Sequence, residues 1–171
     1  LFRSWKSELE RRDPLHRYSK NLRTYNAYWT THCRTDADDD DGVWLWLTNN
    51  PFFSLPACPR EVLERQRVAY LSSSEREMYR VDIVDGVFLQ NGAPLTTSDG
   101  EWIFVLSKEK LLYANIKVRG AFHHTSFLAG QPCLAAGGFT VTKGRLEFLL
   151  PHSGHYRPSE AHLRVLLQYL S

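Results

Sequence analysis

The spacing of apolar residues changes along the chain, from a helical period in the first third to a period of two after residue 79. In the first third, apolar side chains recur at intervals of four, three and four, which marks one face of an α-helix: Tyr18, Leu22, Tyr25 and Trp29. Trp5 and Leu9 are also four apart. Asp13-Pro14 separates the two stretches, because a residue before proline avoids the helical conformation. We therefore predict two helices in this part.

Three further segments follow before the period changes. Residues 43–47 are bulky and apolar, and we predict a short buried strand there. Pro59 suits a first helical turn, so a helix is expected from Pro59 to about Tyr70. Ser74 and Glu77 have the spacing of a capping box, which predicts one more short turn of helix.

Apolar and polar residues alternate after residue 79, which is typical of strands. Asp85-Gly86 is a strong signal for a two-residue hairpin turn, and Lys143-Gly144 marks another. A third hairpin joins residues 102–106 to 111–116 through a turn rich in Lys and Glu. A last helix, capped by Pro158-Ser159, is expected to bury one leucine-rich side: Leu163, Leu166, Leu167 and Leu170.

This order of elements predicts an α+β fold. Helices occupy about residues 1–78, an antiparallel sheet or partly closed barrel of β-hairpins occupies about 79–150, and a helix ends the chain at about 159–170. The length of 171 residues and a hydrophobic content of 43% suit a single domain over residues 1–171 and exclude a disordered chain. Because the chain does not begin with Met, we interpret it as a fragment of a longer protein.

Charge and cysteine content limit the partners and the cellular location that we expect. Lys and Arg number 21 against 19 Asp and Glu, so neither nucleic acid nor an acidic membrane surface is an expected partner. No apolar run is long enough to span a bilayer. Cys33, Cys58 and Cys133 lie far apart without a CxxC pair, which favours free thiols and a cytoplasmic location.

The acidic run at residues 36–41 resembles a calcium loop only superficially. Such a loop needs glycine at its sixth position and a bidentate Glu at its twelfth, where this chain has Asp41 and Leu47. We therefore predict a solvated loop without a metal ion.

Polar residues gather in two clusters, at residues 122–138 and at residues 151–158. A hairpin of about a dozen residues lies between them, and a hairpin returns the chain beside its start. The clusters can therefore meet at one end of the sheet and form a pocket. Metal binding is not expected, because the adjacent His123 and His124 would point to opposite faces of a strand.

Such a pocket would combine groups for acid/base or nucleophilic chemistry with groups for holding an anion. The candidate catalytic residues are the imidazoles and hydroxyls His124, His155, Ser126 and Ser153. The candidate ligand-binding residues offer a ring face, cations or close backbone approach: Tyr156, Arg157, Lys117, Gly130, Gly137 and Gly154. The alternative is structural, because histidines and hydroxyls beside glycines often satisfy buried backbone groups.

The chain also carries short motifs in a fixed order, among them Asp13-Pro14-Leu15-His16-Arg17-Tyr18, Cys58-Pro59-Arg60, Glu75-Arg76-Glu77, His124-Thr125-Ser126-Phe127-Leu128-Ala129-Gly130 and Ser153-Gly154-His155-Tyr156-Arg157-Pro158. With these motifs the chain resembles, nearly end to end, the large conserved domain of plant IQ-motif calmodulin-binding proteins and of related fungal and bacterial proteins. It departs from the plant pattern in the insertion at residues 36–41, and in Asn115 and His123.

The resemblance implies calmodulin as a partner, bound through an IQ helix upstream of this domain. No I-Q-x-x-x-R-G-type stretch occurs in these 171 residues. The similar bacterial domains occur in large toxin-like polymorphic proteins, which implies an enzymatic activity. ADP-ribosyl transfer is one version, with His124 and Tyr156 holding NAD, although Glu160 follows too closely.

Two hypotheses therefore stand side by side. In the first, the pocket binds a small anionic or nucleotide-like ligand and acts as a transferase or hydrolase. In the second, the chain is a non-catalytic signalling and interaction module whose polar clusters brace the sheet.

Overall fold

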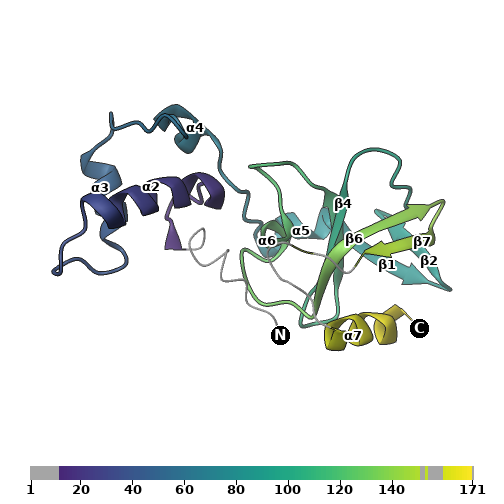
Figure 1. Cartoon of the computed structure of the whole chain (residues 1–171). Helices are drawn as coiled ribbons and strands as arrows, with labels where there is room; N and C mark the ends of the chain where they lie inside the picture. The colour runs from purple at the N-terminus through teal and green to yellow at the C-terminus, as the bar shows by residue number, and fades with distance from the viewer. Residues whose placement is uncertain (1–11, 151–152, 154–159, 171) are drawn as a thin grey trace.

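The computed structural model describes residues 12–150, 153 and 160–170. Its elements, in chain order, are α2 (Ser19–His32), α3 (Gly42–Asn49), α4 (Arg60–Arg65), α5 (Ser73–Arg76), η1 (Glu77–Tyr79), β1 (Arg80–Val84), β2 (Val87–Gln90), β3 (Ala93–Pro94), β4 (Trp102–Leu106), β5 (Leu112–Ile116), α6 (His124–Phe127), β6 (Ala135–Thr142), β7 (Arg145–Leu150) and α7 (Glu160–Leu170). Helices α2, α3 and α4 form one lobe, here called the helical lobe (Figure 1). The strands with α5, α6 and α7 form the second, the sheet lobe.

The sheet lobe is built on seven antiparallel strands in the order β3-β2-β1-β5-β4-β6-β7. The sheet curls, because the turn between β6 and β7 reaches back to the other edge. There Gly144 accepts a hydrogen bond from the Phe88 amide and donates one to the Leu95 carbonyl, each at 2.8 Å. The α+β fold class and the partly closed sheet of hairpins are therefore confirmed.

Both faces of β4, which lies between β5 and β6 in the sheet, are buried. Phe104 and Leu106 face a core covered by α7, and Ile103 and Val105 face a second core beneath α6. This alternation follows from the period of two along a strand. Buried on both faces, β4 holds the two layers of the lobe together.

The predicted hairpin turns are confirmed. Asp85 and Gly86 have positive φ angles of 50° and 75°, and Lys143 and Gly144 have 49° and 79°, as tight hairpin turns require. The short edge strand β3 and the one-turn helix α6 were not predicted from the sequence. Residues 135–138, which were assigned to a pocket, lie within strand β6.

The strand predicted at residues 43–47 is wrong. Residues 43–47 form part of helix α3 and not a strand. Their bulk fits both structures, but Val43 and Leu47 lie one helical turn apart and are buried, whereas Leu45 is 66% exposed. The acidic loop also favours a helix start, because Asp41 accepts a hydrogen bond from the Trp44 indole. Leu22, Tyr25 and Trp29 of the predicted stripe are confirmed on the buried face of α2, whereas Tyr18 is half-buried and lies one residue before the helix.

Three smaller predictions were also wrong. The helix that starts after Pro59 ends at Arg65 and does not reach Tyr70. The capping box uses Ser72 and Glu75 in place of Ser74 and Glu77, so the turn begins two residues earlier. On α7, Leu166 is buried but Leu167 is 51% exposed, because consecutive residues of a helix point about 100° apart. The predicted helix around Trp5 and Leu9 and the cap at Pro158-Ser159 lie outside the described residues.

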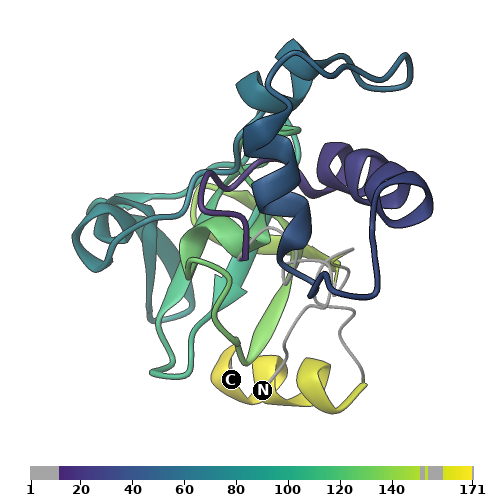
Figure 2. The same cartoon turned by 90° about the vertical axis from the view of Figure 1, so that its left-hand side faces the viewer.

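A junction of three segments, residues 13–18, 66–71 and 120–126, connects the two lobes. Figure 2 views the molecule from the side of the helical lobe, with α7 at the bottom. Backbone hydrogen bonds run from Tyr18 to Gln66, from Val68 to His16 and from Ala69 to Ala121, at 2.7 to 2.8 Å. The connection between the lobes is therefore itself hydrogen-bonded structure.

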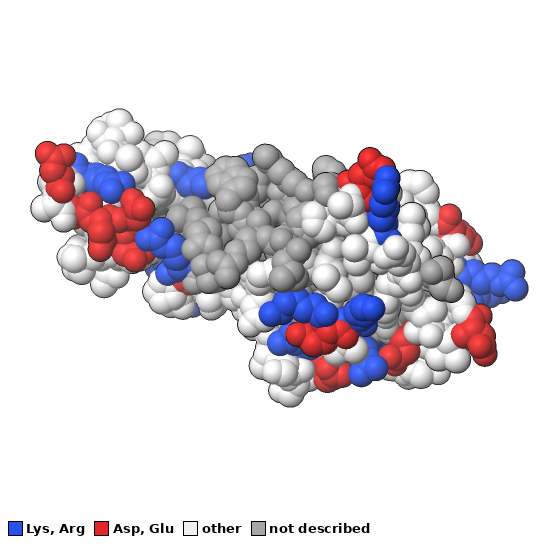
Figure 3. All heavy atoms as spheres, turned by 90° about the horizontal axis from the view of Figure 1, so that it is seen from below, with Lys and Arg blue, Asp and Glu red and all other residues white. Residues whose placement is uncertain are grey.

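Surface charge differs between the two ends. Acidic side chains gather at the end of the helical lobe, and basic and acidic side chains are interspersed over the sheet lobe (Figure 3). Among the helices in the described part of the chain, none is long and apolar enough to cross a membrane.

Candidate functional site

The first predicted cluster forms a tight turn at the start of α6. Ser126 is fully buried, and its hydroxyl oxygen accepts a hydrogen bond from the His123 amide at 2.9 Å. The Ser126 amide donates in return to the His123 carbonyl at 2.9 Å, and the Ser126 carbonyl accepts from the Leu71 amide at 3.0 Å. Ser126 therefore closes the turn and joins it to the segment that leads in from the helical lobe.

His124, the candidate base, is also buried and bonded to the main chain. Its Nε2 donates to the Gly137 carbonyl of strand β6 at 3.0 Å, since a carbonyl can only accept. That nitrogen therefore carries a proton in the folded protein. To take up a proton there, His124 would have to give up its bond to the sheet.

His123 stands at the contact between the lobes. Its ring stacks on Tyr18 with centroids 5.4 Å apart, and its Nε2 accepts a hydrogen bond from the Gly120 amide at 3.1 Å. A second pair, His16 and Tyr70, has centroids 4.3 Å apart. Both histidine–tyrosine pairs belong to the junction.

The predicted ligand-binding residues of this region also have structural contacts. Gly130 has a φ of 74° in the turn after α6, which favours glycine. A Cβ on Gly137 would lie 2.3 Å from the Leu150 carbonyl oxygen and 3.0 Å from the Phe104 ring. Lys117 pairs with both carboxylate oxygens of Glu101 at 2.9 Å.

The second predicted cluster is described only at Ser153, which is buried with 1% exposure. His155, Tyr156, Arg157 and Gly154 lie outside the described residues. Gly138 pairs with Leu150 in the sheet, and the second cluster starts directly after Leu150. The meeting of the two clusters stays a prediction.

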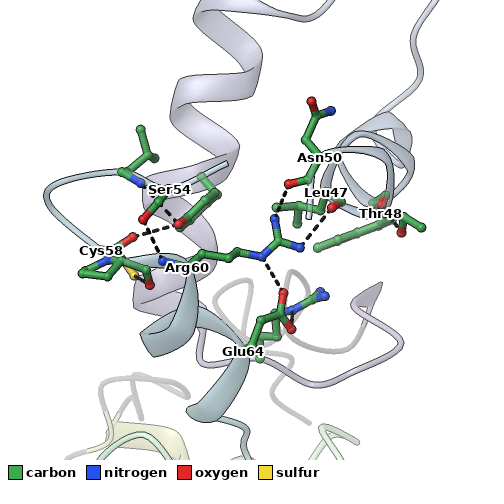
Figure 4. Close-up of polar contacts among 12 residues, drawn as sticks. Leu47, Thr48, Asn50, Ser54, Cys58, Arg60 and Glu64 are labelled. Atoms are coloured by element: carbon green, nitrogen blue, oxygen red, sulfur yellow. Dashed lines mark hydrogen bonds and ion pairs between the residues drawn. The ribbon is translucent and has the colours of Figure 1, made fainter. Parts of the chain in front are cut away.

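Sequence reasoning missed a network of arginines in the helical lobe. Arg60 lies beside the end of α3, where its guanidinium donates to the carbonyls of Asn50 and Leu47 at 2.9 and 3.0 Å (Figure 4). The same group donates to Glu64 at 2.8 Å, and Arg17 donates to the other oxygen of Glu64 at 3.0 Å. Burial raises the pKa of Glu64, but the bonds and charges of Arg17 and Arg60 outweigh this effect and lower it overall.

The arginine network extends to the motif at residues 13–18 and gives Asp13 and Arg17 a structural role. Asp13 is fully buried and accepts hydrogen bonds from the Arg17 amide at 2.7 Å and from the Arg17 guanidinium at 2.9 Å. Arg17 therefore bridges Asp13 and Glu64. The signal in the sequence was the i, i+4 spacing of Asp13 and Arg17, which suits an ion pair.

The cysteines are all free, as predicted. Cys133 is fully buried, and burial raises the pKa of its thiol to about 12. It therefore stays protonated at neutral pH, which does not suit a nucleophile.

The carboxylates of the acidic loop accept hydrogen bonds from neighbouring residues. Asp38 accepts from the Thr35 amide at 2.7 Å, and Asp41 accepts from Arg12 at 2.7 Å. These bonds explain the acidic run as the support of the turn before α3.

Comparison with known proteins shows which family the chain resembles. Residues 75–163 match the family model of the IQ motif-containing protein middle domain. The IQ domain-containing protein IQM3 of Arabidopsis thaliana is 41% identical over 175 residues, which cover 99% of this chain and 37% of the relative. IQM2 of the same plant is 41% identical over 170 residues, which cover 95% of this chain and 28% of the relative.

The chain thus spans about a third of the length of these relatives. No solved structure is significantly similar to it. The plant part of the expected resemblance is confirmed, and its fungal and bacterial part stays a prediction. With 41% identity to IQM3 over nearly its whole length and a family model matched from residue 75 to residue 163, the chain belongs to the family of IQ motif-containing proteins.

Proposed function

We propose that this chain is a non-catalytic interaction module of an IQ motif-containing protein. The observation that carries the proposal is the bonding of Ser126 and His124, which are both buried and committed to backbone groups. A nucleophile and a base must reach a substrate, whereas the Ser126 hydroxyl closes the turn at the start of α6 and the His124 ring bonds α6 to β6. They satisfy buried backbone groups, as the structural alternative expects.

Calmodulin is the partner that this family suggests. Both relatives are named for an IQ domain, and the 171 residues contain no I-Q-x-x-x-R-G-type stretch. We infer that calmodulin binds through an IQ segment outside these residues, and that the present chain contributes a folded surface for further contacts.

A ligand screen on two variants tests the non-catalytic role. Ser126→Ala removes the acceptor of the His123 amide, and we expect the free energy of unfolding to fall by about 2 kcal/mol. Thr31→Ala is the matched control, because the exposed Thr31 hydroxyl donates to the Ala27 carbonyl of its own helix, and its loss should change stability by less than about 0.5 kcal/mol. Thermal unfolding is then repeated with nucleotides, NAD and sugar phosphates.

The proposal expects no ligand-dependent rise in melting temperature for the wild type or for either variant. A saturable rise in the wild type that Ser126→Ala abolishes, with the variant otherwise as stable as the wild type, would restore the catalytic hypothesis.

Calorimetry with calmodulin tests the placement of the partner. Residues 1–171 are titrated with calmodulin in calcium and in a chelator, and Arabidopsis IQM3 serves as the comparison protein. We expect binding by IQM3 and none by residues 1–171. A complex with residues 1–171 would contradict an IQ segment outside this chain as the binding site.

A further inference from the structure

Helix α3 has a composition that does not suit its place in the molecule. Every residue from 43 to 47 is apolar, and a helix that is apolar on all sides is normally covered on all sides. Val43 and Leu47 are buried in the core of the helical lobe, whereas Leu45 is 66% exposed. The helix lies at the outer end of this lobe (Figure 1). It therefore leaves apolar surface open to solvent.

A second apolar side chain is exposed directly after α3. Phe52 is 96% exposed, so almost its whole ring lies in water. Its neighbour Phe53 packs on the rings of Tyr28 and Trp46, with centroids 4.8 and 5.1 Å apart, and the Phe53 amide donates to the Asn50 carbonyl at 3.2 Å. These contacts fix the turn in which Phe52 stands. Phe52 is thus held outward before a partner arrives, which lowers the entropic cost of binding.

The loop before α3 carries more negative charge than its cations balance. Residues 36–41 contain five aspartates. Asp40 pairs with Arg34 at 3.1 Å, and Asp41 pairs with Arg12 at 2.7 Å. The other three aspartates form no ion pair with the residues that the structure describes. Acidic side chains accordingly gather at this end of the molecule (Figure 3).

The charged and apolar parts adjoin, which decides the chemistry of the partner. Asp41 precedes Leu45 by four residues, about one helical turn. A basic amphipathic helix matches both parts, because its cations face the loop while its apolar stripe packs on Leu45 and Phe52. An anionic membrane surface has the wrong charge. A two-fold contact with a second copy would bring two acidic loops together.

We propose that the α3 face, formed by Leu45, Phe52 and the acidic loop at residues 36–41, docks a basic amphipathic helix of a partner protein. The proposal rests on the role of the chain as an interaction module, and it adds the surface and the kind of partner. It also accounts for the apolar run at residues 43–47, which by sequence suits a buried segment and which the partner would cover.

Calorimetric titration of residues 1–171 with three peptides of equal length tests charge and apolar contact separately. Acetyl-LKKALKALKKALKA-amide is the basic amphipathic helix. Acetyl-LEEALEALEEALEA-amide has the same leucines with acidic side chains, and acetyl-AKKAAKAAKKAAKA-amide has the same lysines without leucine. We expect the first peptide to bind at least about 10-fold more tightly than either of the others, with an affinity that falls as salt is added.

Substitutions at exposed positions locate the binding. Phe52→Gln should weaken binding of the basic amphipathic peptide about 10-fold, and Asp36→Asn should weaken it about 2- to 3-fold. Phe148→Gln is the matched control, because Phe148 is also exposed, at 59%, but lies on β7 of the sheet lobe. The amide NMR spectrum shows whether each variant is folded. Leu45→Gln, expected to act like Phe52→Gln, keeps the test valid if Phe52→Gln does not fold.

Equal affinity for the basic and acidic peptides, or for the lysine peptides with and without leucine, would overturn the proposal. Unchanged affinity in folded Phe52→Gln would do the same. A dimer of residues 1–171 that Phe52→Gln dissociates, or binding to phosphatidylserine-phosphatidylcholine vesicles in place of the peptide, would assign the α3 face to another occupant and contradict it. The ligand screen on Ser126→Ala examines the sheet lobe, so the two proposals fail separately.

Discussion

The two lobes are stabilised by different interactions. The sheet lobe has two layers of apolar side chains on either side of β4, built from residues such as Phe104 and Val105. The helical lobe has a smaller apolar core around Leu22, Tyr25 and Leu63, and an arginine network beside it. Arg60 and Arg17 there meet at Glu64.

This difference follows from the amount of apolar surface that each lobe can bury. Three short helices bury too little apolar surface to be stable by that alone, so the ends of α3 and α4 are held by charge-assisted hydrogen bonds. The sheet lobe has both faces of its sheet covered and needs no such network. Polar side chains near the junction have structural contacts: His123 stacks on Tyr18 between the lobes, whereas Ser126 and His124 bond backbone groups within the sheet lobe.

The largest expected effect is steric and belongs to the sheet lobe. Gly137→Ala would place a Cβ 2.3 Å from the Leu150 carbonyl oxygen, and we expect a loss of about 3 kcal/mol in the free energy of unfolding. Gly92→Ala is the control, since its φ of 77° is strained for alanine but no atom lies within 4 Å, and about 1 kcal/mol is expected. Urea unfolding measures both; equal losses would contradict close packing at Gly137.

The next effect is expected in the helical lobe. Arg60→Ala removes the donor to Leu47, Asn50 and Glu64, and the free energy of unfolding should fall by about 2 kcal/mol. Trp29, Trp44 and Trp46 lie in this lobe, so tryptophan fluorescence in urea reports on it. Arg65→Ala, at an exposed position of the same helix, should change stability by less than about 0.5 kcal/mol. If both variants behave alike, the network does not stabilise the lobe.

A smaller effect depends on pH. The pKa of Glu64 is lowered in the folded state, so its contribution to stability is complete above the ordinary value of 4.5 and is lost as the pH falls through the folded pKa. Glu64→Gln has no carboxylate to protonate at this position, so it should lack this loss of stability. The loss in the wild type is expected to be about 1 kcal/mol, because solvent screens the partly exposed side chain. Unfolding followed by tryptophan fluorescence between pH 7 and pH 3 measures it. The same pH slope in both proteins would show that Glu64 is not the group responsible.

The last prediction involves no change in stability and compares the reactivity of two cysteine thiols. Cys33, half-buried at the end of α2, should react with a thiol reagent in the folded protein, whereas Cys133, with its raised pKa, should react about 100-fold more slowly. Mass spectrometry of the modified peptides identifies the site. Rapid modification of Cys133 under native conditions would mean that the core beneath α6 opens readily.

Periodicity was enough to predict most of the elements, because α2 and the hairpins have clear periods and turn residues such as Asp85-Gly86. It failed for residues 43–47, where a short apolar run suits strand and helix alike and only the preceding acidic turn favours the helix. Residue type alone could not separate a catalytic Ser126 from a structural one. That difference depends on its burial and on which backbone groups approach it, which the tertiary structure determines.

Native-state hydrogen exchange at the His123 and Leu71 amides tests the central claim most directly, since both donate to Ser126. The bracing role predicts that both amides exchange only on global unfolding in the wild type. In Ser126→Ala, protection of the His123 amide should fall at least about 10-fold further than that of Leu71, because only its acceptor is removed. Exchange of these two amides at the rate of an unstructured peptide in the wild type would contradict the account.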